Sequence, residues 1–299
     1  LQSLLSLASA PDAIAAGSPI QKNALIAALP GQVPDDSRDA SPTDPELEHQ
    51  SATLVFYLTA LAESFIQTVT DLQQQPAARR QQNQQLLDIA ETARTMALAM
   101  DFGFLLAPDR DLLAIGYALD SNQLDESCYD LLASEARLAS LFAIAKGDAD
   151  SKHWFRLGRS ATPLGYGSAL LSWSGSMFEY LMPSLVMRAA AGSLLEQSNR
   201  LIVERQIGYG RQLGIPWGIS ESAYNARDLE FTYQYSNFGV PGLGLKRGLA
   251  ENKVIAPYAT ALATMVNPVA ACANFERLKA SGALADYGFF EAIDYTRTR

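Results

Sequence analysis

Apolar residues in the first third of the chain recur at spacings of three and four. The repeating positions are Leu54, Leu58, Leu61, Phe65, Val69 and Leu72. This period is typical of one face of an amphipathic helix. Thr43 followed by Pro45 and Glu46 predicts the start of that helix, because a capping side chain is paired with a carboxylate three residues on. A glutamine-rich turn around Pro76 separates it from a second helix, predicted over about residues 83–100.

The pattern before these helices is different. Residues 1–42 combine a short Ala/Leu-rich stretch, which predicts a helix, with a polar segment over residues 30–39 that is rich in helix breakers. We therefore expect an N-terminal helix and connector over residues 1–42 and a main domain over residues 43–299.

Helices alternate with loops through the rest of the chain. Two short β-like runs flank the turn residues 108–111 and predict an inserted β-hairpin. Helical periodicity is then found at residues 129–146, 175–190, 194–213, 255–265 and 267–281. The loops between them, at residues 164–167, 217–228 and 238–244, are rich in glycine and aromatic residues. This alternation predicts a mainly α fold in which helical hairpins form a ring, with functional loops at one end.

Composition narrows the class of protein. The 299 residues are 48% apolar and 18% charged, which fits an ordinary globular protein. A net charge of -9 without a Lys/Arg cluster argues against nucleic acid as a partner. Two distant cysteines and two histidines make a disulfide scaffold, a metal site or a Ser-His-Asp triad improbable. We expect neither a metal nor a cofactor.

No uninterrupted apolar run reaches the roughly 20 residues that a membrane-spanning helix needs. The best candidate, residues 168–187, is interrupted by Glu179 and Pro183, so we expect no membrane span. The sequence starts at Leu1 without a charged segment followed by an apolar one, which predicts no signal peptide and a piece of a longer protein.

The side chains of residues 216–228 suggest carbohydrate chemistry. Within this stretch Glu221 stands among an indole, a phenol, an amide and a guanidinium, from Trp217, Tyr224, Asn225 and Arg227. Aromatic rings offer an apolar face to a sugar ring, and amides and guanidinium groups supply directional hydrogen bonds. A carboxyl group can act as acid, base or nucleophile. The local chemistry therefore indicates a sugar-cleaving enzyme.

A second carboxylate cluster lies at residues 287–295 and contains Glu291 and Asp294. Glycoside chemistry generally uses two carboxyl groups, so we expect Glu221 and Glu291 to form the pair, with Asp294 in reserve. Simpler roles remain open: Glu221 could interact with a helix dipole, and Glu291 could be a buried partner of an Arg or Tyr. Glu179 is either a substrate-binding or catalytic group or a satisfied core charge.

Several aromatic residues are candidate sugar platforms. They are Tyr166, Trp173, Trp217, Tyr224, Tyr233 and Tyr235. Aromatic residues in helical barrels usually pack in the core instead, and we expect about two of these to contact a sugar. Trp217 beside Glu221 could also raise the pKa of that carboxyl by excluding water, as an acid requires.

Several motifs resemble a known family. Residues 129–138, 153–159 and 171–183, together with the two carboxylate clusters, are similar to the glycoamylase-like middle region of the cyclic β-1,2-glucan synthases. The resemblance covers about residues 50–299. It implies an (α/α) toroid that is truncated at its C-terminal end here, because the family's similarity continues further. It also implies a parent synthase on the cytoplasmic side of the bacterial inner membrane, whose other domains polymerise and trim the glucan.

The resemblance implies that this segment closes linear β-1,2-glucan into a ring. A β-linkage then replaces a β-linkage, which requires two displacements and carboxyl groups roughly 5 to 5.5 Å apart, against about 6.5 to 9.5 Å in an inverting hydrolase. We expect Glu221 as acid/base and Glu291 as nucleophile. A β-1,2-glucanase and a non-catalytic glucan-binding domain are the alternatives.

Overall fold

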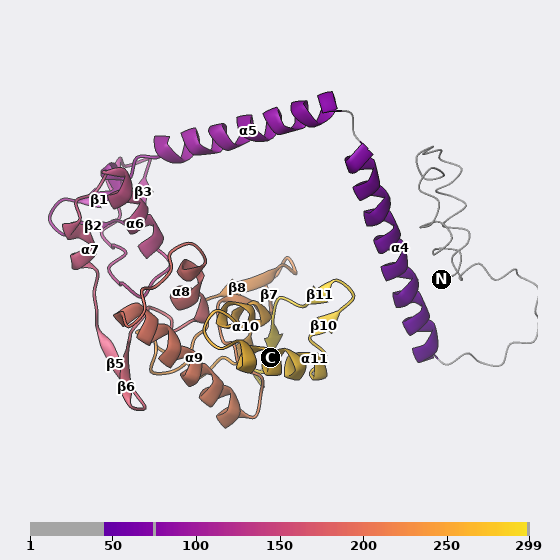
Figure 1. Ribbon diagram of the computed structural model, residues 1–299. Coiled ribbons are helices and arrows are strands. Elements are labelled where there is room, and N and C mark those ends of the chain that lie inside the picture. The colour runs from indigo at the N-terminus through magenta and orange to yellow at the C-terminus, as the bar shows by residue number, and fades with distance from the viewer. Residues whose placement is uncertain (1–44, 74–75, 298–299) are drawn as a thin grey trace, which may run out of the picture. The chain divides into compact units, whose positions relative to one another are not determined.

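The computed structural model describes residues 45–73 and 76–297 (Figure 1). The helix and connector predicted within residues 1–42, and the cap predicted at Thr43, lie outside the described residues. The chain divides into two compact units, Leu1–Thr92 and Ala93–Arg299. Each unit is described by itself below.

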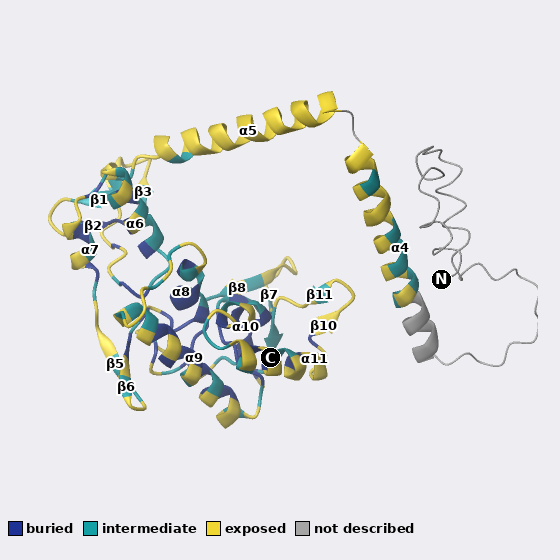
Figure 2. Ribbon diagram, in the orientation of Figure 1, coloured by how far each residue is buried: buried dark blue, intermediate teal, exposed yellow. Residues whose placement is uncertain are grey.

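Two long helices form the described part of the first unit and lead into the second: α4 (Pro45–Gln73) and α5 (Pro76–Ala99). Both predicted helices are confirmed, but α5 begins at Pro76 rather than near residue 83. Proline is well tolerated in the first turn of a helix, and the Ala, Arg and Gln residues that follow are good helix formers. No residue of α5 is buried, and exposed apolar side chains also line α4 (Figure 2).

One described helix, α4, bears on the expectation of no membrane span. The segment Thr53–Gln73 has a mean hydropathy of 1.2, and by length and composition alone it could cross a membrane. The search for an uninterrupted apolar run missed it because Glu63, Gln67 and Asp71 break the run. Residues 168–187, the earlier candidate, instead divide among strand, loop and short helices.

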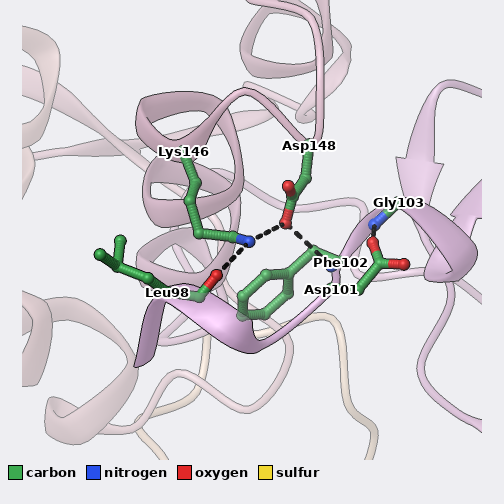
Figure 3. Close-up of polar contacts among 6 residues, drawn as sticks. All are labelled: Leu98, Asp101, Phe102, Gly103, Lys146 and Asp148. Atoms are coloured by element: carbon green, nitrogen blue, oxygen red, sulfur yellow. Dashed lines mark hydrogen bonds and ion pairs between the residues drawn. The ribbon is translucent and has the colours of Figure 1, made fainter. Parts of the chain in front are cut away.

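Within the second unit, a lysine and an aspartate hold the end of α5 (Figure 3). Lys146 Nζ donates a hydrogen bond to the carbonyl of Leu98 at 2.9 Å and pairs with Asp148 Oδ2 at 3.1 Å. The same carboxylate oxygen accepts from the backbone N–H of Phe102 at 3.0 Å. An ammonium group at a helix C-terminus satisfies a carbonyl that has no partner within the helix, so these contacts, all within the second unit, hold the last turn of α5 against the end of α6.

The second unit opens with small hairpins and two helices. The predicted β-hairpin is confirmed, although its strands have only two residues each. The elements are η1 (Gly103–Leu105), β1 (Leu106–Ala107), β2 (Leu112–Leu113), β3 (Tyr117–Ala118), β4 (Gln123–Leu124), α6 (Arg137–Lys146) and α7 (Lys152–Arg156). α6 starts eight residues later than predicted because bridges from Cys128 to Ala114 and from Leu131 to Gly158 hold the preceding segment extended.

The remaining elements surround one hydrophobic core (Figures 1 and 2). In order they are β5 (Ala161–Leu164), β6 (Gly167–Leu170), α8 (Met177–Leu181), η2 (Met182–Leu185), α9 (Leu194–Leu213), β7 (Ser222–Arg227), β8 (Tyr233–Ser236), β9 (Val254–Ile255), α10 (Pro257–Ala263), α11 (Pro268–Ala280), β10 (Leu284–Ala285), β11 (Gly288–Phe289) and β12 (Ile293–Asp294). Every sheet of the described residues has two strands, and all these pairs are antiparallel. The fold is therefore mainly helical with small sheets, as the sequence predicts.

The helix α9 has clear start and stop signals. The Ser193 side chain accepts a hydrogen bond from the N–H of Glu196 at 3.3 Å, and Gly214 ends the helix in the left-handed conformation. Its buried face includes Leu201, Ile202 and Val203. The predicted helix over residues 175–190 is instead the short α8 followed by η2, because a proline inside a helix removes a hydrogen bond and ends the regular turns.

Candidate active site

The hairpin β7–β8 carries several of the candidate residues. Ala223 lies opposite Tyr235, and Ser222 lies opposite Ser236. Because side chains alternate between the two faces of a strand, Ala223 and Tyr235 share one face, while Ser222 and Tyr224 point to the other. The Tyr224 ring packs edge-on against Phe238, with 5.2 Å between centroids, so that second face is the one toward the core. The outward face, with Tyr235 59% exposed, is open to a ligand.

Glu221 lies immediately before β7 and is half-buried. Burial, together with the charges of Glu135 and Glu179, raises the pKa of its carboxyl to about 7. A carboxyl group with such a pKa retains its proton near neutral pH and can donate it. Glu221 therefore has the electrostatic setting of a general acid.

Two tyrosines share this setting with Glu221 and Glu291. Burial raises the pKa of the Tyr235 hydroxyl, and the charges of Glu221 and Glu291 raise it as well. Burial likewise raises the pKa of Tyr258, which lies on α10, with contributions from the same two carboxylates and Tyr235. The Tyr258 hydroxyl is also 2.8 Å from the backbone oxygen of Glu221. The structure thus brings Glu221, Glu291 and Tyr235 into one region.

Glu291 and Asp294 contact the free edge of β7. Glu291 Oε1 accepts a hydrogen bond from the N–H of Ala223 at 2.9 Å, and Asp294 Oδ2 accepts from the N–H of Asn225 at 3.2 Å. These N–H groups point away from β8, so the two carboxylates act as acceptors where a third strand would lie. Glu291 also lines an open pocket of about 460 Å³. The other lining residues are Pro257, Tyr258, Ala261, Phe275, Phe289 and Phe290.

Glu135 is a carboxylate that the sequence favours as a structural group, tying a loop or pairing with Arg137, rather than as a catalytic one. It lies just before α6, and its charge has the largest electrostatic influence on the Glu221 carboxyl after burial. The nearby Arg137 is 2% exposed and donates to the carbonyl oxygens of Glu179 and Tyr180, at 3.1 and 2.8 Å. Those contacts connect the loop of Glu135 to α8. The sequence offered one signal for Glu135: it is a carboxylate within residues 129–138, one of the motifs that resemble the known family.

Glu179 is only 7% exposed and is surrounded by hydrogen-bond donors. Its carboxylate accepts from the hydroxyls of Ser172, Ser174 and Ser176 at 2.8, 2.6 and 2.9 Å. It also accepts from the N–H groups of Ser174 and Ser176, each at 2.9 Å. Five such contacts occupy both oxygens and hold the loop over residues 172–176 in shape. This arrangement supports the role of Glu179 as a buried charge with satisfied hydrogen bonds, which is one of the roles that the sequence left open.

The aromatic candidates separate by exposure. Trp217 is 3% exposed and belongs to the hydrophobic core, so its ring offers little surface to a sugar. Trp173 and Tyr233 are exposed. Tyr166 is exposed in the β5–β6 turn, where its hydroxyl is 3.3 Å from a carboxylate oxygen of Glu204 on α9. Among the exposed candidates, Tyr235 is the one on which the charges of both Glu221 and Glu291 act.

The polar members of residues 216–228 lie on the outer part of β7. Asn225 and Arg227 are exposed, and Arg227 is opposite Tyr233 in the strand register. Across residues 45–73 and 76–297 there is no group of three or more His, Cys, Asp and Glu side chains arranged to hold a metal ion.

Comparison with known proteins identifies relatives of this chain. It is 62% identical over 216 residues to the protein named cyclic beta-(1,2)-glucan synthase NdvB of Rhizobium meliloti (strain 1021), a match that covers 72% of this chain and 8% of that protein. Two crystal structures of glucoamylase-like proteins are similar in fold. That from Bacteroides caccae has a TM-score of 0.51 at 14% identity, covering 70% of this chain and 54% of its own.

The second crystal structure, from Bacteroides fragilis, has a TM-score of 0.50 at 15% identity and covers 70% of this chain and 53% of its own. The family model Glycoamylase matches residues 127–299. That range includes Glu135, Glu221, Glu291 and both strands of the β7–β8 hairpin. The chain belongs to the glycoamylase family.

Proposed function

We propose that this chain is the carbohydrate-active part of a cyclic β-1,2-glucan synthase and closes linear β-1,2-glucan into a ring by anomer-retaining transglycosylation. The support is twofold: the chain is 62% identical to a protein with that name over 216 residues, and it has a carboxyl-rich site beside an exposed tyrosine. The observation that carries the enzymatic role is Glu221, a half-buried carboxyl whose pKa is raised to about 7 next to other carboxylates.

In the first step a carboxylate attacks the anomeric carbon of a glucosyl unit. The glycosidic C–O bond breaks, a carbon–oxygen bond to the enzyme forms, and Glu221 gives its proton to the departing oxygen. Tyr235, exposed beside Glu221, is suited to support the sugar ring through its face. The raised pKa of Glu221 suits this step because the proton is still present near neutral pH.

In the second step the hydroxyl at the other end of the same glucan chain attacks the enzyme-bound carbon. Its proton passes to the Glu221 carboxylate as the carbon–oxygen bond to the enzyme breaks. The anomeric carbon is inverted twice, so the new linkage is again β and Glu221 is returned to its protonated form.

The attacking carboxylate has two candidates. Glu291 shares its surroundings with Glu221 and Tyr235 but gives one oxygen to the N–H of Ala223, and Asp294 stays its reserve. Glu135 has the stronger electrostatic influence on Glu221. Replacing Glu221, Glu291 or Glu135 by Ala and adding azide distinguishes the roles, because Ala leaves room for the azide. The product is a β-glycosyl azide when the acid/base is missing and an α-glycosyl azide when the nucleophile is missing.

Two other functions make different products from the same substrate. The decisive experiment incubates the chain with linear β-1,2-glucan and then with an exo-acting β-glucosidase. Glucan that resists the glucosidase is cyclic and supports transglycosylation, whereas new reducing ends support a β-1,2-glucanase that uses water. Unchanged glucan that still binds supports a glucan-holding domain, and Glu221→Gln is the control for catalysis.

The proposal extends to the parent protein. The chain spans 8% of the length of the synthase relative and about half of each glucoamylase-like structure. We infer an (α/α) toroid that the helical hairpins of the second unit help to build, and further domains of the synthase as partners. We also infer that the parent lies on the cytoplasmic side of the inner membrane, which localisation of a tagged full-length synthase would test.

A further inference from the structure

The backbone that leads to Glu221 is held by two buried amide side chains. On α11, Asn274 Oδ1 accepts a hydrogen bond from the N–H of Trp217 at 3.1 Å, and Asn274 Nδ2 donates to the carbonyl of Trp217 at 2.8 Å. The amide nitrogen also donates to Thr260 Oγ1 at 2.8 Å. Asn274 is 1% exposed, so all its polar contacts are made inside the protein.

A second amide repeats this arrangement two residues further along. On α9, Gln206 Oε1 accepts from the N–H of Ile219 at 2.9 Å, and Gln206 Nε2 donates to the carbonyl of Ile219 at 2.7 Å. Gln206 is also 1% exposed. Each amide therefore satisfies one backbone N–H and one backbone C=O at alternate positions, as a neighbouring β-strand would do.

The structure leaves little freedom around this segment. A Cβ added at Gly210 on α9 would lie 2.7 Å from Trp217 Cβ, so helix and segment are in direct contact. Gly218, between the two held residues, has φ of 118°, a conformation that residues with a Cβ rarely adopt. Ser220 Oγ accepts from the N–H of Phe178 at 3.0 Å. The chain is thus fixed at successive points up to Glu221.

We propose that Gln206 and Asn274 are positioning residues that form an amide clamp on residues 217–219 and hold the Glu221 carboxyl in its half-buried place. The proposal rests on the function proposed above for Glu221 but concerns only the placement of that group. The charged and titratable groups that interact with the carboxyl are Glu135, Glu179, Tyr235 and Tyr258, and Glu291 interacts with the same two tyrosines. None of these belongs to the clamp, so loosening the clamp changes their distance from Glu221 without changing their number.

The test is a titration of Glu221 that does not require activity. The full chain is labelled with ¹³C at the glutamate carboxyl groups, and the Glu221 signal is assigned by its loss in Glu221→Gln. The wild-type signal should titrate at about pH 7. In Gln206→Met, which keeps the side-chain length but removes both hydrogen bonds, the midpoint should fall toward the ordinary value of 4.5 as the carboxyl becomes hydrated.

Asn199→Leu is the matched control. Asn199 is another buried amide on α9, but it donates to Ser184 Oγ rather than to residues 217–219. This variant should leave the Glu221 midpoint at its wild-type value. Asn274→Ala tests the other half of the clamp, and the same fall in the Glu221 midpoint is expected. It replaces Gln206→Met in the titration if that variant does not fold. In an active protein, each clamp variant should lower kcat roughly 10- to 100-fold with little change in KM.

Two results would overturn the clamp. One is a wild-type midpoint for Glu221 in folded Gln206→Met or Asn274→Ala, and the other is an equal shift in Asn199→Leu. Hydrogen exchange on the wild-type chain gives a check without any variant: the N–H groups of Trp217 and Ile219 should exchange as slowly as those in the centre of α9, and fast exchange contradicts the clamp. If Glu221→Gln kept full activity, only the proposed function would fail.

Discussion

At the scale of a single residue, the burial of Glu221 links catalysis to stability. Ionisation of the carboxyl is unfavourable in the folded state because the group is half-buried near other carboxylates, and for the same reason it keeps its proton near neutral pH. Its folded pKa of about 7 lies above the ordinary 4.5. The associated stability is fully present below pH 4.5 and is lost as the pH rises through 7.

We therefore expect Glu221→Gln to stabilise the chain at pH 8, since the amide has no proton to lose. The gain in the free energy of unfolding should be about 1 to 2 kcal/mol, after allowing for the partial exposure of the carboxyl. Below pH 4.5 the two proteins should differ little. Denaturant unfolding at pH 4 and pH 8 measures this, with Glu276→Gln on the exposed face of α11 as the control. A gain of equal size at both pH values would contradict the assigned pKa.

The same substitution should remove catalysis. If Glu221 is the acid, Glu221→Gln lowers kcat on linear β-1,2-glucan by about 100-fold or more, because general acid–base catalysis contributes roughly 10²- to 10⁴-fold. The wild-type rate should fall as the pH rises above about 7, where the proton is lost. Initial rates from pH 5 to 9 measure this. An unchanged rate in the variant would remove Glu221 from the reaction.

Glu179 illustrates a carboxylate with a structural role. Removing it leaves the hydroxyls of Ser172, Ser174 and Ser176 and two N–H groups without their acceptor. We expect Glu179→Ala to cost about 3 to 5 kcal/mol of unfolding free energy, because buried donors are left unsatisfied. Thermal or denaturant unfolding measures the loss. Glu204→Ala, at an exposed position on α9, should stay within about 0.5 kcal/mol.

These residues show what local sequence can and cannot predict. Glu221 stood out because side chains typical of sugar-binding sites surround it in the sequence. Trp217 was part of that pattern, but the contact of its backbone with Gly210 places it in the core. The influence of Glu135 on Glu221 depends on groups 86 residues apart (221 − 135). Such distances are fixed by tertiary packing, which no short motif encodes.

Secondary structure was predictable where the periodic pattern of apolar residues extends over many residues. α9 matched the predicted residues 194–213 because a capping serine, a helical period and a terminal glycine agree. The start of α6 was missed because two isolated bridges, not the helical pattern, decide the conformation of the preceding segment. Strands of two residues, such as β9 and β12, are too short for any alternation to be seen.

Two glycines on α9 give opposite predictions for the same substitution. A Cβ at Gly208 would meet nothing within 4 Å, whereas a Cβ at Gly210 would lie 2.7 Å from Trp217 Cβ. Gly208→Ala should stabilise the chain by about 0.5 to 1 kcal/mol, because alanine is the better helix former. Gly210→Ala should instead destabilise it by about 1 to 3 kcal/mol, because α9 and residue 217 must move apart. Denaturant unfolding measures the free energy of unfolding of both variants. An equal change in the two variants would contradict the close packing at Gly210.

At the scale of the whole molecule, the mainly helical class followed from the alternation of helices and loops. The sequence did not reveal that the division into units occurs after Thr92, within α5. A continuous helical pattern in the sequence gives no sign of where one unit ends. The spacing of apolar residues predicts the helix, but whether the helix packs against other elements depends on the tertiary structure. The shared core of the second unit, by contrast, joins elements from β2 to α11.

This division predicts that residues 93–299 fold without the preceding part of the chain. The hydrophobic core of the second unit consists, among the described residues, of side chains from that unit alone, so the shortened protein keeps them all. The shortened protein should keep the melting temperature of that unit within about 2 °C, and Glu221 should titrate at the same pH. Calorimetry and the carboxyl titration measure the two properties, and a large fall in either would mean that the first unit stabilises the second. A protein starting at residue 101 is the control: it loses the Leu98 carbonyl that accepts from Lys146 and should be less stable by about 1 kcal/mol.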